Sequence, residues 1–243
     1  MLAMSQSVKY EPAESEFGHP CPVVTVDLVL MSIVDGTPAV LLIRRDDDFC
    51  GGQWALPGGF VHIDEAVDAT AERILRDKAS MSGAYVEQLF TFGRVDRDPR
   101  MRVITVAYFG LLPPEHFTPA LRGRDDLMLA CVDVPWTGEI GGAVKALGPD
   151  GELTLAFDHA DILATAILRL RGKLDYSPVG FALLPEQFTL RQLQDVHEAI
   201  LGTKLNKPAF RRRMLDRGWL NATGTREIGS SYRPAELFRH RPN

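Results

Sequence analysis

The chain has 243 residues, of which 45% are hydrophobic and 24% are charged, as expected of a globular protein with one large or two small domains. Its three cysteines, Cys21, Cys50 and Cys131, form no C-x-x-C pair, which argues against a disulfide framework and against a zinc site. No apolar run approaches the ~20 residues that span a bilayer, and residues 1–20 lack the apolar core of a signal peptide. We therefore expect a cytoplasmic protein without membrane contact.

The net charge of −5 is unevenly distributed along the chain. Residues 1–186 contain 16 basic and 27 acidic side chains, whereas residues 187–243 contain 11 basic and 5 acidic ones. The first part therefore has a net charge of −11 and the second a net charge of +6. Such an asymmetry indicates that the C-terminal part contacts nucleic acid or another anionic partner, although a solvated basic tail would have the same composition.

The predicted elements begin with β-strands. Segments 22–34 and 38–45 are rich in Val, Ile and Leu and lie on either side of the turn Asp-Gly-Thr-Pro. A glycine loop and a helix over about 64–79 come next. Further strands are expected at 89–95, 102–112, 127–134, 143–147 and 153–157. The last two are separated by Gly-Pro-Asp-Gly, the residue order of a hairpin turn. This order predicts an α/β domain with a mixed sheet and flanking helices.

The glycine loop and the helix after it have the spacing of the Nudix signature, a Gly, a Glu, an Arg-Glu pair and a Glu-Glu pair at fixed intervals. The positions that match are Gly59, Glu65, Arg73 and Leu75. The three positions at which the signature has metal-binding Glu residues are occupied by Ile74, Asp77 and Lys78. This segment therefore resembles the Nudix family in its frame, with the metal ligands replaced.

These replacements change the chemistry that the helix can support. Positions 74, 77 and 78 lie on one helix face, and Mg²⁺ requires oxygen ligands there. Hydrolysis of a diphosphate needs such a cation to neutralise charge and to activate water. We therefore expect a domain that binds a nucleotide diphosphate, with no catalytic residues, no metal and no required cofactor. The alternative is a divergent hydrolase whose metal ligands have moved to Asp64, Glu65, Asp68, Glu72 or Asp77.

If a diphosphate lies over this helix, as the resemblance implies, Lys78 can replace the metal as a point charge. Further candidates for contacts with the ligand are Arg44, Arg97 and Arg100 for its phosphates or ribose, and Phe60 or Tyr108 for its base. A surface ion pair with Asp96 or Asp98 explains each arginine equally well.

From residue 158 onward the apolar residues recur at helical spacing. Ile162, Ala166, Ile167 and Leu170 form one apolar stripe. This stripe predicts a helix over 158–174 that bridges two domains or buries against both.

Two short helices are predicted in the C-terminal part. The first begins with a capping box, Thr189 and Gln192, and ends at Gly202. The second begins at Asn206, a favoured N-cap residue, and ends at Gly218. Its inner face carries Phe210 and Met214, and its outer face is basic. A polar hairpin over 221–234 follows.

This order of elements predicts a winged helix-turn-helix, in which the second helix enters the major groove of DNA. The residues expected to contact DNA are Thr189, Lys204, Asn206, Lys207, Pro208, Arg211, Arg212, Arg213, Thr225, Arg226 and Arg233. A solvated helix face is the alternative explanation of the arginines. RNA is less favoured as a ligand, because the sequence shows no sheet motif with stacking aromatic residues.

The combination of both halves is similar to the Nudix-related transcriptional regulators, the NrtR family. Four segments carry the resemblance, which covers most of the chain: GGFVHIDE, GRVDRDPRMRVITVAYFGLL, FDHADILATAILRLRGKLDYSPVGFALLP, and FTLRQLQDVHEAILG with FRRRMLDRG. It implies an α/β Nudix fold followed by an α+β winged helix-turn-helix. It also implies a homodimeric repressor of NAD-metabolism or pentose-utilisation genes that binds a palindromic operator, associates with the nucleoid, and responds to ADP-ribose or a related nucleotide.

We accordingly expect an N-terminal arm over 1–20, an effector-binding domain over 21–157, and a linker helix with a DNA-binding domain over 158–243. Ligand binding is expected to reorient the winged helices through the helix at 158–174. Two other functions stay open. One is an active ADP-ribose pyrophosphatase with a basic C-terminal domain, and the other is a scaffold or tRNA-associated protein.

Overall fold

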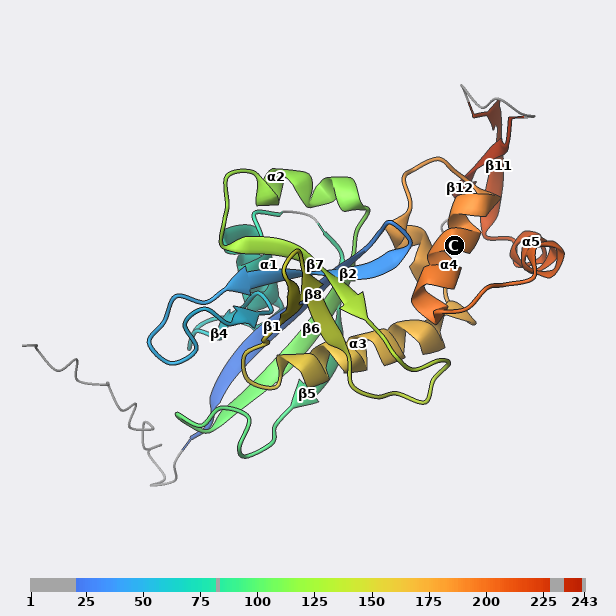
Figure 1. The fold of residues 1–243 in the computed structure, drawn as a ribbon. Helices are drawn as coiled ribbons and strands as arrows, with labels where there is room; N and C mark the ends of the chain where they lie inside the picture. The colour runs from blue at the N-terminus through green and yellow to red at the C-terminus, as the bar shows by residue number, and fades with distance from the viewer. Residues whose placement is uncertain (1–20, 82–83, 228–233, 242–243) are drawn as a thin grey trace, which may run out of the picture.

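A mixed β-sheet makes up most of the molecule, and a smaller part with its own sheet follows it (Figure 1). The computed structural model describes residues 21–81, 84–227 and 234–241. The strands of the larger sheet are β1 (Val23–Val34), β2 (Thr37–Arg44), β3 (Trp54–Ala55), β4 (Gly58–Phe60), β5 (Val86–Phe92), β6 (Val103–Leu111), β7 (Leu127–Asp133), β8 (Lys145–Gly148) and β9 (Gly151–Leu153). Their order is β5-β6-β1-β2-β7-β8-β9, with β3 paired to β2 and β4 paired to β1.

Strand β1 lies inside this sheet, between β6 and β2. It pairs in parallel with β6 and antiparallel with β2. The turn between β1 and β2 consists of Asp35 and Gly36, which both have positive φ angles, 49° and 74°, as a two-residue hairpin turn requires. The predicted turn is therefore confirmed.

The last strand of the sheet differs from its prediction. Segment 153–157 was expected to be a strand, but β9 covers Gly151–Leu153 and pairs with β8 across the Gly-Pro-Asp-Gly turn. Residues after β9 leave this edge because they bond to β3: the Trp54 N–H donates to the Thr154 carbonyl at 2.9 Å, and the Ala156 N–H donates to the Trp54 carbonyl at 2.8 Å. The chain is thereby led from the sheet edge toward its centre.

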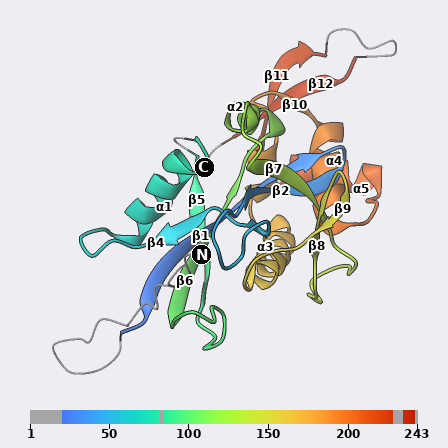
Figure 2. The same ribbon diagram turned by 60° about the vertical axis from the view of Figure 1, so that its left-hand side comes forward.

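Helices cover both faces of the sheet (Figures 1 and 2). The α-helices are α1 (Val67–Asp77), α2 (Thr118–Leu121), α3 (His159–Leu174), α4 (Leu190–Leu201) and α5 (Lys207–Asp216), and the 3-10 helices are η1 (Pro114–His116) and η2 (Val179–Leu183). Side chains of β1 alternate between two cores. Leu28 and Leu30 pack in the core that contains Ile74 of α1, whereas Val29 and Met31 pack in the core that contains α3.

The C-terminal part has the winged-helix order that the sequence predicts. Strand β10 (Phe188–Thr189) precedes α4 and α5, and strands β11 (Leu220–Arg226) and β12 (Glu236–His240) form the hairpin after them. The capping box of Thr189 and Gln192 is present, and Gly202 ends α4 with a φ of 68°. Asn206 caps α5 by accepting the Ala209 N–H at 3.1 Å. These helix boundaries are confirmed because each depends on local capping chemistry.

Helix α3 joins the two parts. Its apolar stripe lies in one continuous core with Val29 of the large sheet and with Leu193 and Phe238 of the winged helix. Near its C-terminus, Arg171 is 2% exposed. Its guanidinium donates to the carbonyls of Ile200 at 2.7 Å and Trp136 at 2.8 Å. It therefore ties α3 both to the end of α4 and to the segment after β7.

No helix among the described residues is long and apolar enough to cross a membrane.

The substitution Arg171→Met should lower the free energy of unfolding by about 2–4 kcal/mol, because it leaves buried carbonyls without the charged donor that they now have. Urea unfolding followed by circular dichroism measures the loss. The control is Arg169→Met, on the same helix but exposed, which should change stability by less than about 0.5 kcal/mol. Equal stabilities of the two variants would contradict this role of Arg171.

Candidate functional site

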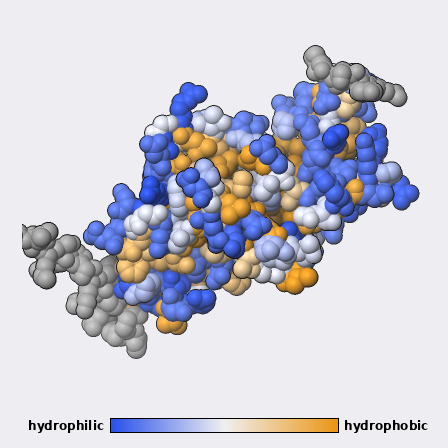
Figure 3. Space-filling view, viewed as in Figure 1, coloured by the Kyte–Doolittle hydropathy of each residue, from blue (hydrophilic) through white to orange (hydrophobic). Residues whose placement is uncertain are grey.

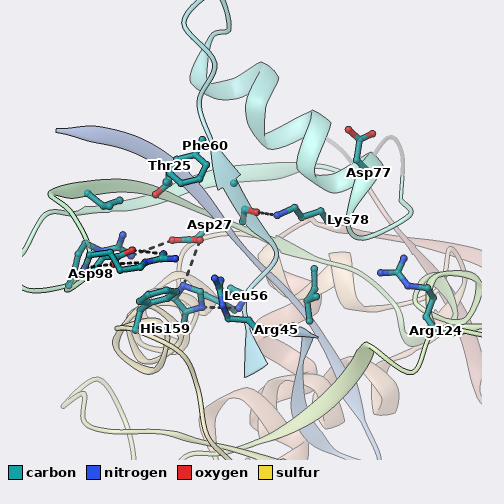
Figure 4. Close-up of a pocket in the computed structure, with 17 residues that line it drawn as sticks. Thr25, Asp27, Arg45, Leu56, Phe60, Asp77, Lys78, Asp98, Arg124 and His159 are labelled. Carbon is teal, nitrogen blue, oxygen red and sulfur yellow. Dashed lines mark hydrogen bonds and ion pairs between the residues drawn. The ribbon is translucent and has the colours of Figure 1, made fainter. Parts of the chain in front are cut away.

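A pocket of about 390 Å³ opens between the glycine loop, the end of β2, the loop 96–101 and the start of α3 (Figure 4). It is lined by Thr25, Asp27, Ile43, Arg45, Leu56, Gly58, Gly59, Phe60, Asp77, Lys78, Arg97, Asp98, Arg100, Val103, Arg124, Phe157 and His159. Gly58 is needed at its position, because a Cβ there would lie 2.1 Å from the Asp27 Oδ1. The glycine loop can thus approach β1 closely and form one wall of the pocket.

Two cationic side chains converge on this pocket. Lys78 follows α1, and its Nζ donates to the Gly58 carbonyl (Figure 4). Burial lowers the pKa of Lys78, and the positive charges of Arg45 and Arg73 lower it further, while Asp27 raises it. Arg45 forms an ion pair with Asp47, yet its Nε is buried without a hydrogen-bond partner within the described part of the chain. The neighbouring like charges make this a favourable position for an anion.

The Nudix metal positions do not fit a divalent cation. Ile74 is 1% exposed and packs in the apolar core beneath α1. Lys78 brings a positive charge, and the carboxylate of Asp77 lies 2.9 Å from the Arg76 Nε. Among the residues that the structure describes, there is no group of three or more His, Cys, Asp or Glu that could hold a metal ion. The three signature positions therefore do not supply the carboxylates by which the Nudix signature binds metal.

Two of the acids that could serve as relocated ligands have other partners. Glu65 accepts hydrogen bonds from Arg73 at 2.7 and 2.8 Å and from the Thr70 hydroxyl at 2.7 Å. These bonds lower the pKa of Glu65 to about 2. Asp68 accepts the hydroxyl of Tyr108. Both carboxylates are thus occupied by contacts around the start of α1.

The floor of the pocket is a buried ionic network at the start of α3. Arg97 donates to both carboxylate oxygens of Asp158, at 2.9 and 2.7 Å, and lies 3.5 Å from the Asp27 Oδ2. The His159 Nδ1 accepts the Leu56 N–H at 2.9 Å, so the neutral ring carries its proton on Nε2, which lies 3.8 Å from the Asp27 Oδ1. The network connects β1, the loop 96–101 and α3.

The structure brings four of the six predicted ligand-binding residues to the pocket, namely Phe60, Lys78, Arg97 and Arg100. Arg44 and Tyr108 do not line it. Arg44 is exposed, and strand alternation directs its neighbours Ile43 and Arg45 to the pocket instead. Tyr108 is 5% exposed and packs under α1, so it offers no free face for a base.

Two of the four have their charge occupied by carboxylates. Arg97 is paired with Asp158, and Arg100 is paired with Asp98 at 2.8 Å. The sequence reasoning missed Asp27, Arg45, Asp158 and His159. The sequence offers one signal for this network: Asp27 is a single acid within an apolar strand, and a charge buried there needs partners.

The second candidate surface is the outer face of α5. Lys207, Pro208, Arg211 and Arg212 are exposed on it. In the view of Figure 3, hydrophilic residues cover most of the part that contains α4 and α5. Arg213 is half-buried and lies 3.5 Å from Asp175 at the end of α3.

The other predicted DNA contacts lie in different surroundings. Thr189 is 3% exposed and caps α4, so its hydroxyl is not available to DNA. Lys204 forms an ion pair with Glu198 at 2.6 Å, and Asn206 caps α5. Thr225 and Arg226 are exposed on β11 in the hairpin. Arg233 lies outside the described residues.

Fold and site together define a Nudix domain with a cationic pocket, joined to a winged-helix domain of the DNA-binding kind. Residues 23–135 match the model of the NUDIX domain, and residues 180–240 match that of the NrtR DNA-binding winged helix domain. The chain belongs to the NrtR family of transcriptional regulators, which confirms the resemblance and the predicted fold class.

Relatives of known name support this assignment. The ADPR responsive transcriptional repressor NtrR of Acinetobacter baylyi is 36% identical over 223 residues, which cover 91% of this chain and 83% of that protein. The crystal structure of Shewanella oneidensis NrtR complexed with a 27mer DNA is similar at a TM-score of 0.75 with 33% identity, over 90% of this chain and 93% of that one. The ADP-ribose pyrophosphatase of Methanocaldococcus jannaschii is 32% identical over 87 residues, 36% of this chain and 49% of that enzyme.

The His159 ring should titrate below the ordinary histidine pKa of about 6.5, because burial lowers its pKa. The unfolded chain binds this proton more readily, so the contribution of His159 to stability should be lost as the pH falls below about 6.5. Two-dimensional NMR of the imidazole nitrogens follows both the tautomer and the titration. A midpoint at or above the ordinary value would contradict the geometry described for the pocket floor.

Proposed function

We propose that the chain is a transcriptional repressor that binds operator DNA through α5 and ADP-ribose, or a related nucleotide, in the Nudix pocket. The convergence of Lys78 and Arg45 at a Nudix helix without metal ligands is the observation that carries the proposal. The negative charge of a diphosphate complements the positive charges of Lys78 and Arg45. The names of the relatives from A. baylyi and S. oneidensis, a repressor responsive to ADPR and a protein crystallised with DNA, support both ligands.

We further propose that the bound nucleotide is held and not hydrolysed. Lys78 and Arg45 supply positive charge to the diphosphate, but neither can activate a water molecule as a metal ion does. The two buried carboxylates that line the pocket already have cationic partners, because Asp27 lies near Arg97 and Asp98 is paired with Arg100. The nucleotide then acts as a signal.

Operator recognition follows from the winged helix. The exposed basic side chains of α5 face the DNA, and the hairpin of β11 and β12 follows the DNA backbone. A homodimer places two such helices on a palindromic operator whose half-sites are about one DNA turn apart. The operators expected from the family are those of NAD-metabolism genes.

Helix α3 provides the physical connection between the two sites. Its N-cap Asp158 and its first residue His159 belong to the ionic network at the pocket floor, whereas its C-terminal end contacts α5. The Arg217 guanidinium donates to the carbonyls of Leu174 and Asp175, and Arg213 lies near the Asp175 carboxylate. Ligand binding that shifts α3 changes the position of α5, so the dimer no longer matches its two half-sites. Thermodynamic linkage then requires operator DNA to weaken ADP-ribose binding by the same factor.

An active ADP-ribose pyrophosphatase is the second candidate, favoured by the partial match to the M. jannaschii enzyme. One experiment separates the two. Promoter fragments of NAD-metabolism genes are titrated with the protein, with and without ADP-ribose, while the same samples are assayed for hydrolysis in Mg²⁺. We expect salt-dependent, specific DNA binding that ADP-ribose abolishes, with no turnover.

The opposite outcomes are equally clear. Turnover without specific DNA binding would identify a hydrolase, and a preference for RNA, or binding that does not respond to salt, would indicate a scaffold or tRNA-associated protein. Arg212→Ala serves as the matched control, since it removes one exposed basic side chain of α5 and leaves the pocket residues unchanged. This variant should weaken DNA binding and reduce the slope of log affinity against log salt concentration by about 1. Its affinity for ADP-ribose should stay unchanged.

The substitution Lys78→Glu should weaken ADP-ribose binding in the presence of EDTA by on the order of 10-fold to 100-fold, because it replaces a charged donor with a like charge beside the diphosphate. Isothermal titration calorimetry measures the change. Lys145→Glu is the control, since Lys145 is exposed on β8 and outside the pocket. An unchanged affinity of the Lys78 variant would refute the role of this residue.

A further inference from the structure

Two aromatic side chains beside the pocket have no role in the function proposed so far. Phe49 lies in the loop after β2, and Phe157 lies immediately before the N-cap of α3. Their rings are nearly parallel, with planes 12° apart and centroids 6.4 Å apart. The Phe49 side chain is 50% exposed. A large, half-exposed apolar ring beside a charged pocket is a surface on which another planar group can stack.

The position of this pair suits the far end of a ligand bound at Lys78. A second hollow of about 310 Å³ adjoins the pocket and is lined by both Phe49 and Phe157. Phe157 and Arg97 line the pocket as well as the hollow. A molecule whose diphosphate lies at Lys78 and Arg45 can therefore extend past Phe157 toward Phe49.

The backbone of Phe157 is held in an uncommon conformation. Its φ angle is 54°, a left-handed value that residues with a Cβ seldom adopt. The hydrogen bonds around it are regular: the Ala156 N–H donates to the Trp54 carbonyl at 2.8 Å, and the His159 N–H donates to the Ala156 carbonyl at 3.2 Å. Gly or Asn would adopt this conformation more readily. Backbone strain at a bulky aromatic residue indicates that the position of its ring matters for function.

Two guanidinium groups complete the surroundings of the rings. The Cζ of Arg45 lies 4.9 Å from the Phe157 centroid, and the Cζ of Arg100 lies 5.2 Å from the centroids of both rings. Arginine planes and aromatic rings together form the surface on which nucleobases stack. Arg45 also lines the pocket in which the diphosphate is expected. The same residue can thus contact the phosphate and the region of the base.

We propose that Phe49 and Phe157 form the subsite for the planar base of the nucleotide. This inference rests on the proposed function, because it assigns the second half of the same ligand. It also narrows the class of effector to a nucleoside diphosphate derivative that carries a base, as opposed to a sugar phosphate. The base contacts Phe157, the residue immediately before the N-cap of α3, so recognition of the base and displacement of α3 involve the same segment.

The test compares ADP-ribose with ribose 5-diphosphate, which has the diphosphate but no base, by calorimetry on the full chain. The wild-type protein should bind ADP-ribose at least about 10-fold more tightly, the order expected when one base stacks on aromatic residues. Phe49→Ala and Phe157→Ala should remove most of this difference and leave the affinity for ribose 5-diphosphate unchanged. Phe90→Ala is the matched control, since Phe90 is 55% exposed on β5 and lies outside both hollows.

Because Phe49 is half-exposed, its alanine variant should fold. The Phe49 variant therefore tests the subsite even where the Phe157 variant does not fold. Equal affinity of the wild type for the two ligands would overturn the base subsite and leave the proposed function intact. A loss of affinity for both ligands in the Phe49 variant would also overturn it. Failure of the wild type to bind either ligand would instead refute the proposed nucleotide-binding function, and the subsite with it.

Discussion

Two buried guanidinium groups fix helix α3 at its two ends, and both functional regions depend on that helix. At the N-terminal end, the side chain of Arg97 is 4% exposed and pairs with Asp158. At the C-terminal end, Arg171 is satisfied by main-chain carbonyls of the winged-helix part and of the segment after β7. A buried charge that loses its partners costs about 3–5 kcal/mol. Helix α3 therefore moves only together with the segments that Arg97 and Arg171 bind. The proposed connection between the pocket and α5 requires such rigidity.

The Nudix signature divides here into positions that shape the loop and positions that hold metal. Glu65 and Arg73 keep their roles, because Arg73 binds Glu65 and also donates to the Phe60 carbonyl at 2.9 Å. That clamp positions the glycine loop whether or not a cation is present. The metal positions are under no such constraint, so Ile74 can join the core and Lys78 can turn toward the loop. The frame of the Nudix signature is thus preserved while its metal-binding positions have changed.

The sequence predicts well what local chemistry determines. The capping box at Thr189, the N-cap at Asn206 and the turn at Gly36 each involve residues close in the chain. The pocket was harder to predict, because its contacts join distant segments, such as Leu56 and His159, 103 positions apart. The choice of Arg44 in place of Arg45 shows a second limit: one position along a strand reverses the face. Short elements such as α2 give too few periods to recognise.

The separation of the two parts along the molecule, visible in Figure 1, gives the charge asymmetry a direction in space. An acidic segment of net charge −11 and a basic one of net charge +6 create a large electric dipole. The field of a DNA duplex turns such a molecule before contact, with its basic end leading and its acidic end repelled. Encounters in which the pocket side approaches the duplex are disfavoured, so the fraction of collisions that arrive in a productive orientation rises, most strongly at low ionic strength.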